Sequence, residues 1–178
     1  APSEACPQAS GHRVRIVALP GSGMVVQLTW DTPDDPDQSD MFGTDMDLHL
    51  LHWRGNEWFE TPWDCHSLNQ TPNWGAVEAH DDNPSLSRDD SNGAGPETIR
   101  LTEPENTDPN GQGYKVGVYY YRGIVLSLGD GRTPLRSTAT IRIFLEGMLS
   151  WEGTREFEED RLFWEAADIG WFPDNHRV

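Results

Sequence analysis

Regular alternation of apolar and polar residues constrains the fold of this chain more than any other feature of its sequence. The alternation recurs over Met24–Trp30, Met46–Trp53, Tyr114–Tyr121 and Thr138–Glu146, and a further candidate strand covers Arg13–Ala18. A period of two is typical of β-strands with one buried face. The sequence therefore predicts a fold built from strands.

Turn-forming residues separate these stretches, since the 178 residues include 17 Gly and 13 Pro. Shorter strand candidates are Glu57–Glu60, Glu97–Leu101, Ile124–Leu128, Leu149–Glu152 and Arg161–Trp164. Strict alternation is lost over Glu156–Ala167, which could form a short helix instead. We predict an all-β fold: an antiparallel β-sandwich, jelly-roll or immunoglobulin-like, of eight to ten strands with long acidic loops. A leader and first strand (1–23) and the sandwich (24–178) would form a single domain.

The charge of the chain excludes several classes of partner. Thirteen basic and 30 acidic residues give a net charge of −17. A free-standing nucleic-acid-binding protein needs clustered Lys and Arg, so nucleic acid is not an expected partner. No apolar run approaches the ~18 residues that a membrane span needs, so membrane insertion is not expected either.

The acidic residues are concentrated in one third of the chain. Between Asp31 and Asp90 there are fifteen acidic and two basic side chains, and Asp predominates among Gly, Pro, Asn and Ser. Asp-rich turns are typical of sites that bind cations through oxygen ligands. A generally acidic, salt-adapted surface is the alternative interpretation.

The first candidate metal motif is Thr44–Leu50. In a strand Asp45, Asp47 and His49 share one face, and the apolar residues between them point into the core. Adjacent carboxylates repel each other, and a divalent cation relieves the repulsion. His52 is three residues from His49 and would face the other way, so this pair does not predict a zinc site.

The second motif is a Gly-rich acidic loop, Asp81–Glu97. The spacing of its oxygen ligands does not fit an EF-hand. The predicted ligands of a Ca²⁺ ion are Asp45, Asp47, Asp89, Asp90 and Glu97, followed by Asp82 and Asn92. A third acidic stretch contains Asp31, Asp34, Asp35, Asp37 and Asp40. It could bind a second Ca²⁺ ion or form a solvated loop, and the sequence leaves both open.

Motifs for catalysis are scarce. The chain has no Gly-x-Ser-x-Gly sequence, phosphate-binding loop or dinucleotide fingerprint. A hydrolase that uses paired carboxylates stays open as a second alternative. Trp53, Trp58, Trp63 and Trp74 lie in a polar stretch, where they could stack on sugars in a carbohydrate-binding module or could fill the core.

An ordered series of motifs resembles a known type of module. The series comprises Val26–Gln38, Thr44–Leu50, Asn73–Gly75, Asp81–Leu86, Asp89–Glu97 and Tyr114–Tyr120. It resembles a β-sandwich module of large exported proteins from gliding and predatory bacteria, and more remotely pre-peptidase C-terminal domains. The resemblance covers about residues 24–173.

The resemblance implies an extracellular or cell-surface, calcium-binding and non-catalytic module, exported after removal of a signal peptide. We therefore expect a function in binding, adhesion or assembly, with an extracellular protein or polysaccharide as partner. Two cysteines in an exported domain favour a disulfide between Cys6 and Cys65. Two separate thiols are the alternative.

Overall fold

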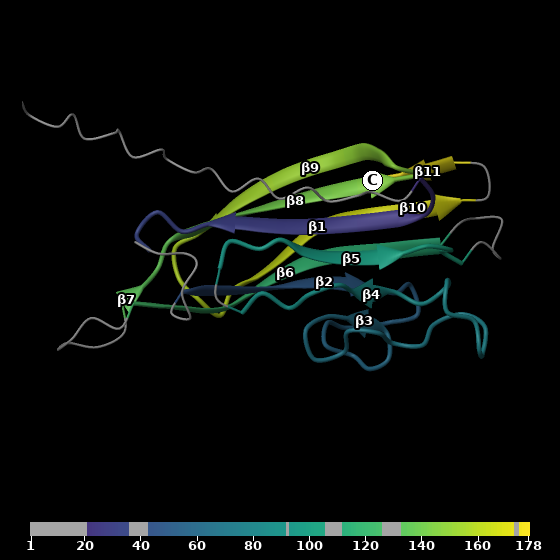
Figure 1. Cartoon of the computed structure of the whole chain (residues 1–178), viewed down its shortest axis with the longest axis horizontal. Coiled ribbons are helices and arrows are strands. Elements are labelled where there is room, and N and C mark those ends of the chain that lie inside the picture. Colours follow the sequence, from purple (N-terminus) through teal and green to yellow (C-terminus); the bar gives the residue numbers. More distant parts are fainter. Residues whose placement is uncertain (1–20, 36–42, 92, 106–111, 126–132, 173–174) are drawn as a thin grey trace, which may run out of the picture.

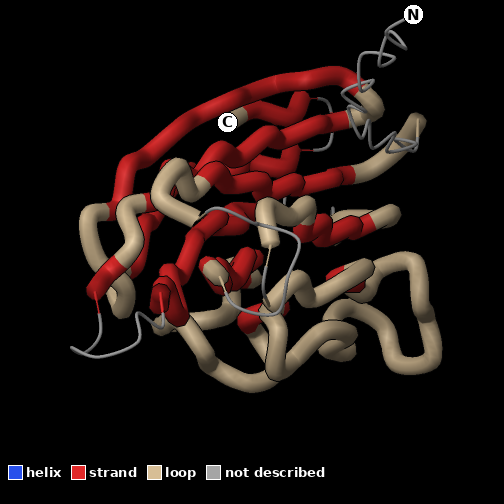
Figure 2. The backbone as a smooth tube through the Cα atoms, turned by 60° about the vertical axis from the view of Figure 1, so that its left-hand side comes forward, coloured by secondary structure: helices blue, strands red, loops and turns tan. Residues whose placement is uncertain are grey.

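The structure, a computed structural model, describes residues 21–35, 43–91, 93–105, 112–125, 133–172 and 175–178. Within these residues the strands form two antiparallel sheets that pack face to face (Figures 1 and 2). The predicted antiparallel β-sandwich is confirmed. The candidate strand Arg13–Ala18 lies outside the described residues.

One sheet has five strands. Their order is β4 (Ser85–Leu86), β5 (Glu97–Leu101), β1 (Met24–Asp31), β8 (Ser137–Leu145) and β9 (Met148–Phe157). In the register, Met24 lies opposite both Leu101 and Leu145. Burial alternates residue by residue along β8, as expected for a strand with one face on the core.

The other sheet has six strands. Their order is β11 (Asn175–Arg177), β10 (Phe163–Phe172), β6 (Gln112–Val125), β2 (Thr44–Leu51) and β3 (Asp64–Cys65), and β7 (Thr133–Pro134) also pairs with β6. β3 pairs with β2 only at Leu50 and Leu51. On the edge of β2 that faces away from β6, Thr44–His49 therefore have no strand partner among the described residues.

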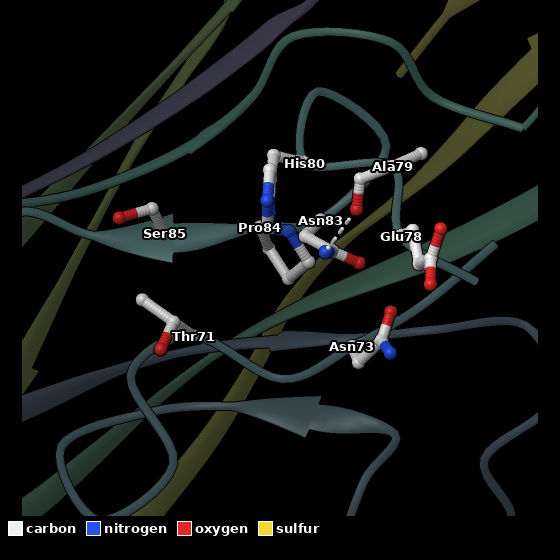
Figure 3. Close-up of a pocket in the computed structure, with 8 residues that line it drawn as sticks. All are labelled: Thr71, Asn73, Glu78, Ala79, His80, Asn83, Pro84 and Ser85. Atoms are coloured by element: carbon white, nitrogen blue, oxygen red, sulfur yellow. Dashed lines mark hydrogen bonds between the residues drawn. The ribbon is translucent and has the colours of Figure 1, made fainter. Parts of the chain in front are cut away.

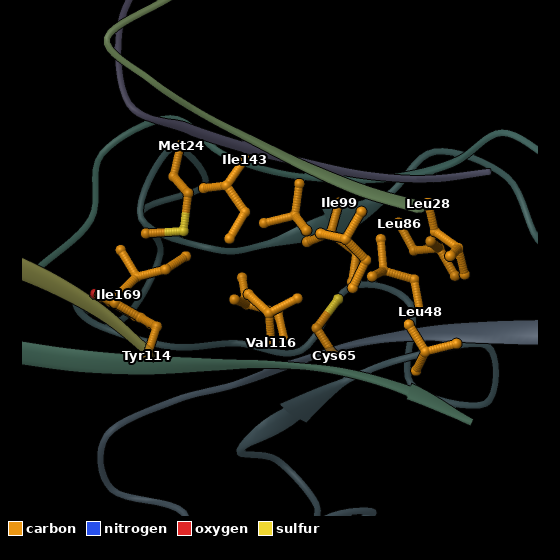
Figure 4. Packing of buried hydrophobic residues seen from close by; sticks show 14 of the residues in the cluster. Met24, Leu28, Leu48, Cys65, Leu86, Ile99, Tyr114, Val116, Ile143 and Ile169 are labelled. Atoms are coloured by element: carbon orange, nitrogen blue, oxygen red, sulfur yellow. The ribbon is translucent and has the colours of Figure 1, made fainter. Parts of the chain in front are cut away.

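The core lies between the two sheets (Figure 4). Ile99 and Ile143 come from the five-stranded sheet and meet Leu48 and Val116 from the other. All of these side chains are fully buried. Burial of apolar area from both sheets is the main force that holds the sandwich together.

The alternative of a short helix and one short strand prediction were wrong. Glu156–Ala167 is not a helix, because β9 continues to Phe157, a turn follows, and β10 begins at Phe163. Arg161 in this turn has a φ of 68°, which ends any helical path. Glu57–Glu60 is a loop, in which the Glu60 carbonyl accepts a hydrogen bond from the Asp64 N–H.

β2 is buried on both of its faces, unlike β8. One face packs on the core, and the chain between β2 and β3 covers part of the other, where Trp58 and Phe59 contact the His49 ring. Polar side chains on this outer face are therefore held away from water. No helix in the described part of the chain is long and apolar enough to cross a membrane.

Candidate metal centre

Asp45 and Asp47 lie on the outer face of β2, as predicted. Met46 and Leu48, which alternate with them, are fully buried in the core. The two aspartates are themselves only 5% and 7% exposed. A pair of carboxylates shielded from water in this way needs positive charge nearby.

Glu97, the first residue of β5, fixes the acidic loop against β2. Its Oε2 accepts a hydrogen bond of 2.8 Å from the N–H of Leu48, on the edge of β2 that has no strand partner. Its Oε1 accepts a bond of 3.0 Å from the N–H of Asp90. One buried carboxylate thus satisfies a free edge amide and holds the loop next to the strand.

This connection brings Asp89 to the two aspartates of β2. Asp45, Asp47 and Asp89 each present a carboxylate oxygen, and these atoms all lie within 4.8 Å of one another. We call these three residues the acidic triad. The structure therefore contains a largely buried carboxylate group that could bind a metal ion.

Burial and mutual repulsion make the charged forms of Asp45 and Asp47 unfavourable. Burial, followed by the charge of Asp47, raises the pKa of Asp45 to about 7, although the Arg122 guanidinium 3.7 Å away lowers it. Burial also raises the pKa of Asp47, against a hydrogen bond from Ser67. Both shifts disfavour the charged carboxylates, so a divalent cation between them would be stabilising.

Glu97 was predicted as a ligand, but the structure gives it a supporting role. Both of its oxygens accept backbone N–H bonds, and it lies outside the triad. Burial raises the pKa of Glu97 to about 9, partly offset by these two hydrogen bonds. The negative charges of Asp47 and Asp89 contribute to this rise in the pKa.

The other predicted ligands are not part of the triad. Asp90 is buried and accepts a hydrogen bond from Arg88 at 3.1 Å. Asp82 accepts the N–H of Ala76 at 2.6 Å and so stabilises its own loop. Asn92 lies outside the described residues.

The suggested second calcium site is only partly described. Asp31 and Asp34 are exposed, and Asp35 closes a turn by donating its N–H to the Thr32 carbonyl. Asp37 and Asp40 lie outside the described residues. These positions form no carboxylate cluster among the residues that the structure describes.

His49, on the same face as the triad, takes part in a different network. Its Nδ1 lies 2.8 Å from Asp64 Oδ2, which also accepts the Phe59 N–H, and its ring stacks on His66. His52 instead stacks on Trp63. The two histidines thus have separate partners.

The four tryptophans proposed as a sugar platform do not form one. Trp74 is 2% exposed and donates its Nε1–H to the Pro62 carbonyl, and Trp63 packs against the core. Trp53 is 44% exposed, with the Arg54 guanidinium over its ring. Trp58 packs on Phe163 and is half-buried.

The predicted disulfide is absent from the structure, since Cys65 is a free, buried thiol. Cys6 lies outside the described residues. Cys65 points into the core between the sheets (Figure 4), where burial raises the pKa of its thiol. A side chain in this position packs as a small apolar group rather than reaching toward the surface.

A separate cavity of about 450 Å³ lies in the loop region before β4 (Figure 3). It is lined by Thr71, Asn73, Glu78, Ala79, His80, Asn83, Pro84 and Ser85. The Asn83 amide is already engaged, because its Nδ2 donates to the Ala79 carbonyl at 2.9 Å. None of the predicted metal ligands lines this cavity.

Sequence reasoning missed the contacts between His49 and Asp64, and a group of aromatic rings on the same face. The outward alternation of Tyr119 and Tyr121 in β6 was a signal for these rings.

Comparisons with protein-family models, curated proteins and solved structures find no match to this chain. These comparisons therefore assign no function to the chain.

Proposed function

We propose that this chain is a calcium-binding β-sandwich module that acts outside the cell, in adhesion or assembly rather than catalysis. The observation that carries the proposal is the acidic triad, in which two nearly buried aspartates meet a third within 4.8 Å. Oxygen ligands favour Ca²⁺ over the softer transition metals.

The triad suits calcium because it supplies several oxygens and leaves others to come from water or a partner. Ca²⁺ takes six to eight oxygen ligands at about 2.3–2.6 Å in a flexible arrangement. Asp89 is exposed, so the ion would remain accessible from one side. The resemblance to exported modules supports an extracellular location, where calcium sites of modest affinity are filled.

A calcium titration of chelator-treated protein tests this proposal. We expect saturable binding by the wild-type chain and binding weakened at least about tenfold in Asp47→Asn, since loss even of a group that supports a ligand typically costs 10- to 100-fold. Asp81→Asn removes the same charge from an exposed loop position and should bind as the wild type does. Equal affinity in both variants would show that only diffuse charge attracts the ion.

A further inference from the structure

Five aromatic side chains form a continuous group on the outer face of the six-stranded sheet. Trp58 packs on Phe163 (ring centroids 4.7 Å apart), Phe163 lies beside Tyr119 (6.3 Å), and Tyr119 beside Tyr121 (6.2 Å). Phe59 contacts Tyr119 at 5.5 Å. We call these five residues the aromatic strip.

The aromatic strip lies directly beside the acidic triad. In the register of the sheet, Tyr119 is the partner of Asp47 on one side and of Phe163 on the other. Side chains at paired positions of neighbouring strands lie on the same face, with Cβ atoms about 4.5–5.5 Å apart. A ligand that covers the Tyr119 ring would therefore lie next to Asp47, and it would approach the triad from the side of the exposed Asp89.

A glycine in β6 gives two of these rings their place. A Cβ at Gly117 would lie 2.6 Å from Phe163 Cζ and 3.1 Å from Trp58 Cη2, so both rings lie over the bare backbone. The Trp58 Nε1–H donates to Glu165 Oε1 at 3.1 Å, which fixes the indole on the sheet. The rings are thus held in position rather than free to turn.

Two rings of the strip, those of Phe59 and Tyr121, are partly exposed to water, and Phe59 has an unfavourable backbone conformation. Phe59 is 47% exposed, although its φ of 66° is unfavourable for a side chain of this size. Tyr121 is 44% exposed and contacts the half-buried Tyr119 ring and the exposed Arg161 guanidinium. Packing of the core does not require the Tyr121 ring at this position.

We infer that a neutral sugar chain binds along the aromatic strip, with its hydroxyl groups directed at the cation held by the acidic triad. The C–H faces of sugar rings pack on aromatic rings, and vicinal hydroxyls are oxygen ligands that complete the coordination of Ca²⁺. Asp47, Asp89 and Glu165 lie in this region together with the Arg161 guanidinium, so even with a cation bound the strip offers no excess of positive charge that would attract an acidic polysaccharide, and an uncharged chain is the ligand we infer. The inference rests on the proposed calcium site and names the ligand of that site.

Calorimetric titration with neutral hexasaccharides of glucose, xylose, mannose and galactose tests the inference, in saturating CaCl2 and in excess EDTA. We expect at least one of them to bind in calcium, and the affinity to fall about tenfold or more in Tyr121→Ala and in EDTA. Trp53→Ala removes an aromatic ring of equal exposure outside the strip and should bind as the wild type does. Calcium binding by Tyr121→Ala should be normal, which shows that this variant is folded.

Three results would overturn the inference. The first is sugar affinity that is the same in Tyr121→Ala as in the wild type, and the second is sugar affinity that is the same in calcium and EDTA. The third is the absence of binding to all four hexasaccharides while calcium titrates normally. That result would leave the proposed function intact and assign the strip to a protein partner, whereas a failed calcium titration would contradict the proposed function itself.

Discussion

At the scale of single residues, the acidic triad sets stability and function against each other. Asp45 is 5% exposed and lies beside Asp47, so its ionised form loses hydration and is repelled by a like charge. Arg122 offsets part of this from 3.7 Å, but the same guanidinium also donates to the Ser91 carbonyl. For stability alone, an uncharged side chain would be favoured over an aspartate at position 45.

We therefore expect Asp45→Asn to stabilise the metal-free protein and to abolish its stabilisation by calcium. Above about pH 7 the wild-type carboxylate is charged at a cost that the amide does not have, so the free energy of unfolding in EDTA should rise by on the order of a few kcal/mol. Urea denaturation in EDTA and in CaCl2 measures both effects. A variant less stable than the wild type in EDTA would show that Asp45 is a structural residue.

The same carboxyl predicts how the stability of the metal-free wild type depends on pH. The pKa of Asp45 in the folded protein, about 7, lies above its ordinary value of 3.8, so the folded state binds the proton more tightly. Stability in EDTA should be greatest below about pH 4 as far as this group is concerned, and should fall as the pH rises to about 7. Glu97, with a pKa of about 9, should extend the fall. Urea midpoints across this range check the sign, and a rise in stability between pH 5 and 7 would contradict it.

At the scale of elements, β6 offers a matched pair of glycines. A Cβ at Gly117 would meet the Phe163 and Trp58 rings, whereas a Cβ at Gly113 meets nothing within 4 Å. We expect Gly117→Ala to displace the rings, destabilise the fold by roughly 1–3 kcal/mol and weaken sugar binding, with calcium affinity unchanged. Gly113→Ala should be neutral or slightly stabilising. Thermal denaturation compares the two, and equal midpoints would refute the packing of rings over Gly117.

The strands that sequence reasoning found are those whose alternation is unbroken. β1, β2, β6 and β8 were located from their patterns alone, and the outward position of Asp45 and Asp47 followed from the same rule. β10 was missed as a long strand because a bulge between Glu165 and Ala167 shifts its register against β6 and interrupts the alternation.

The site was predictable in part, because its ligands are local in sequence but its supports are not. Asp45 and Asp47 share a strand, and an Asp-rich loop predicted Asp89. The hydrogen bond from Leu48 to Glu97 spans 49 residues, so no local pattern announces it. The aromatic strip could not be predicted for the same reason, because its rings come from segments far apart in the sequence: β6, β10 and the chain after β2.

At the scale of the whole molecule, the triad brings a loop of the five-stranded sheet against a strand of the six-stranded sheet. Asp45 and Asp47 belong to the six-stranded sheet, while Asp89 precedes β5 of the other sheet. Glu97 already bridges the two through Leu48. A cation at the triad would therefore tie both sheets together and stabilise the whole sandwich against unfolding.

The most direct measurement of this claim is the free energy of unfolding of the wild-type chain in calcium and in EDTA at neutral pH and equal ionic strength. At a free calcium concentration of a hundred times the dissociation constant, we predict a gain of about 2.7 kcal/mol. In a chain of this length the gain corresponds to a midpoint higher by roughly 5–10 °C. At the same calcium concentration the gain should fall to about 1.4 kcal/mol or less in Asp47→Asn, and it should not be reproduced by NaCl. An unchanged midpoint, or an equal gain from NaCl, would contradict the account and leave the acidity of the chain as an adaptation to salt.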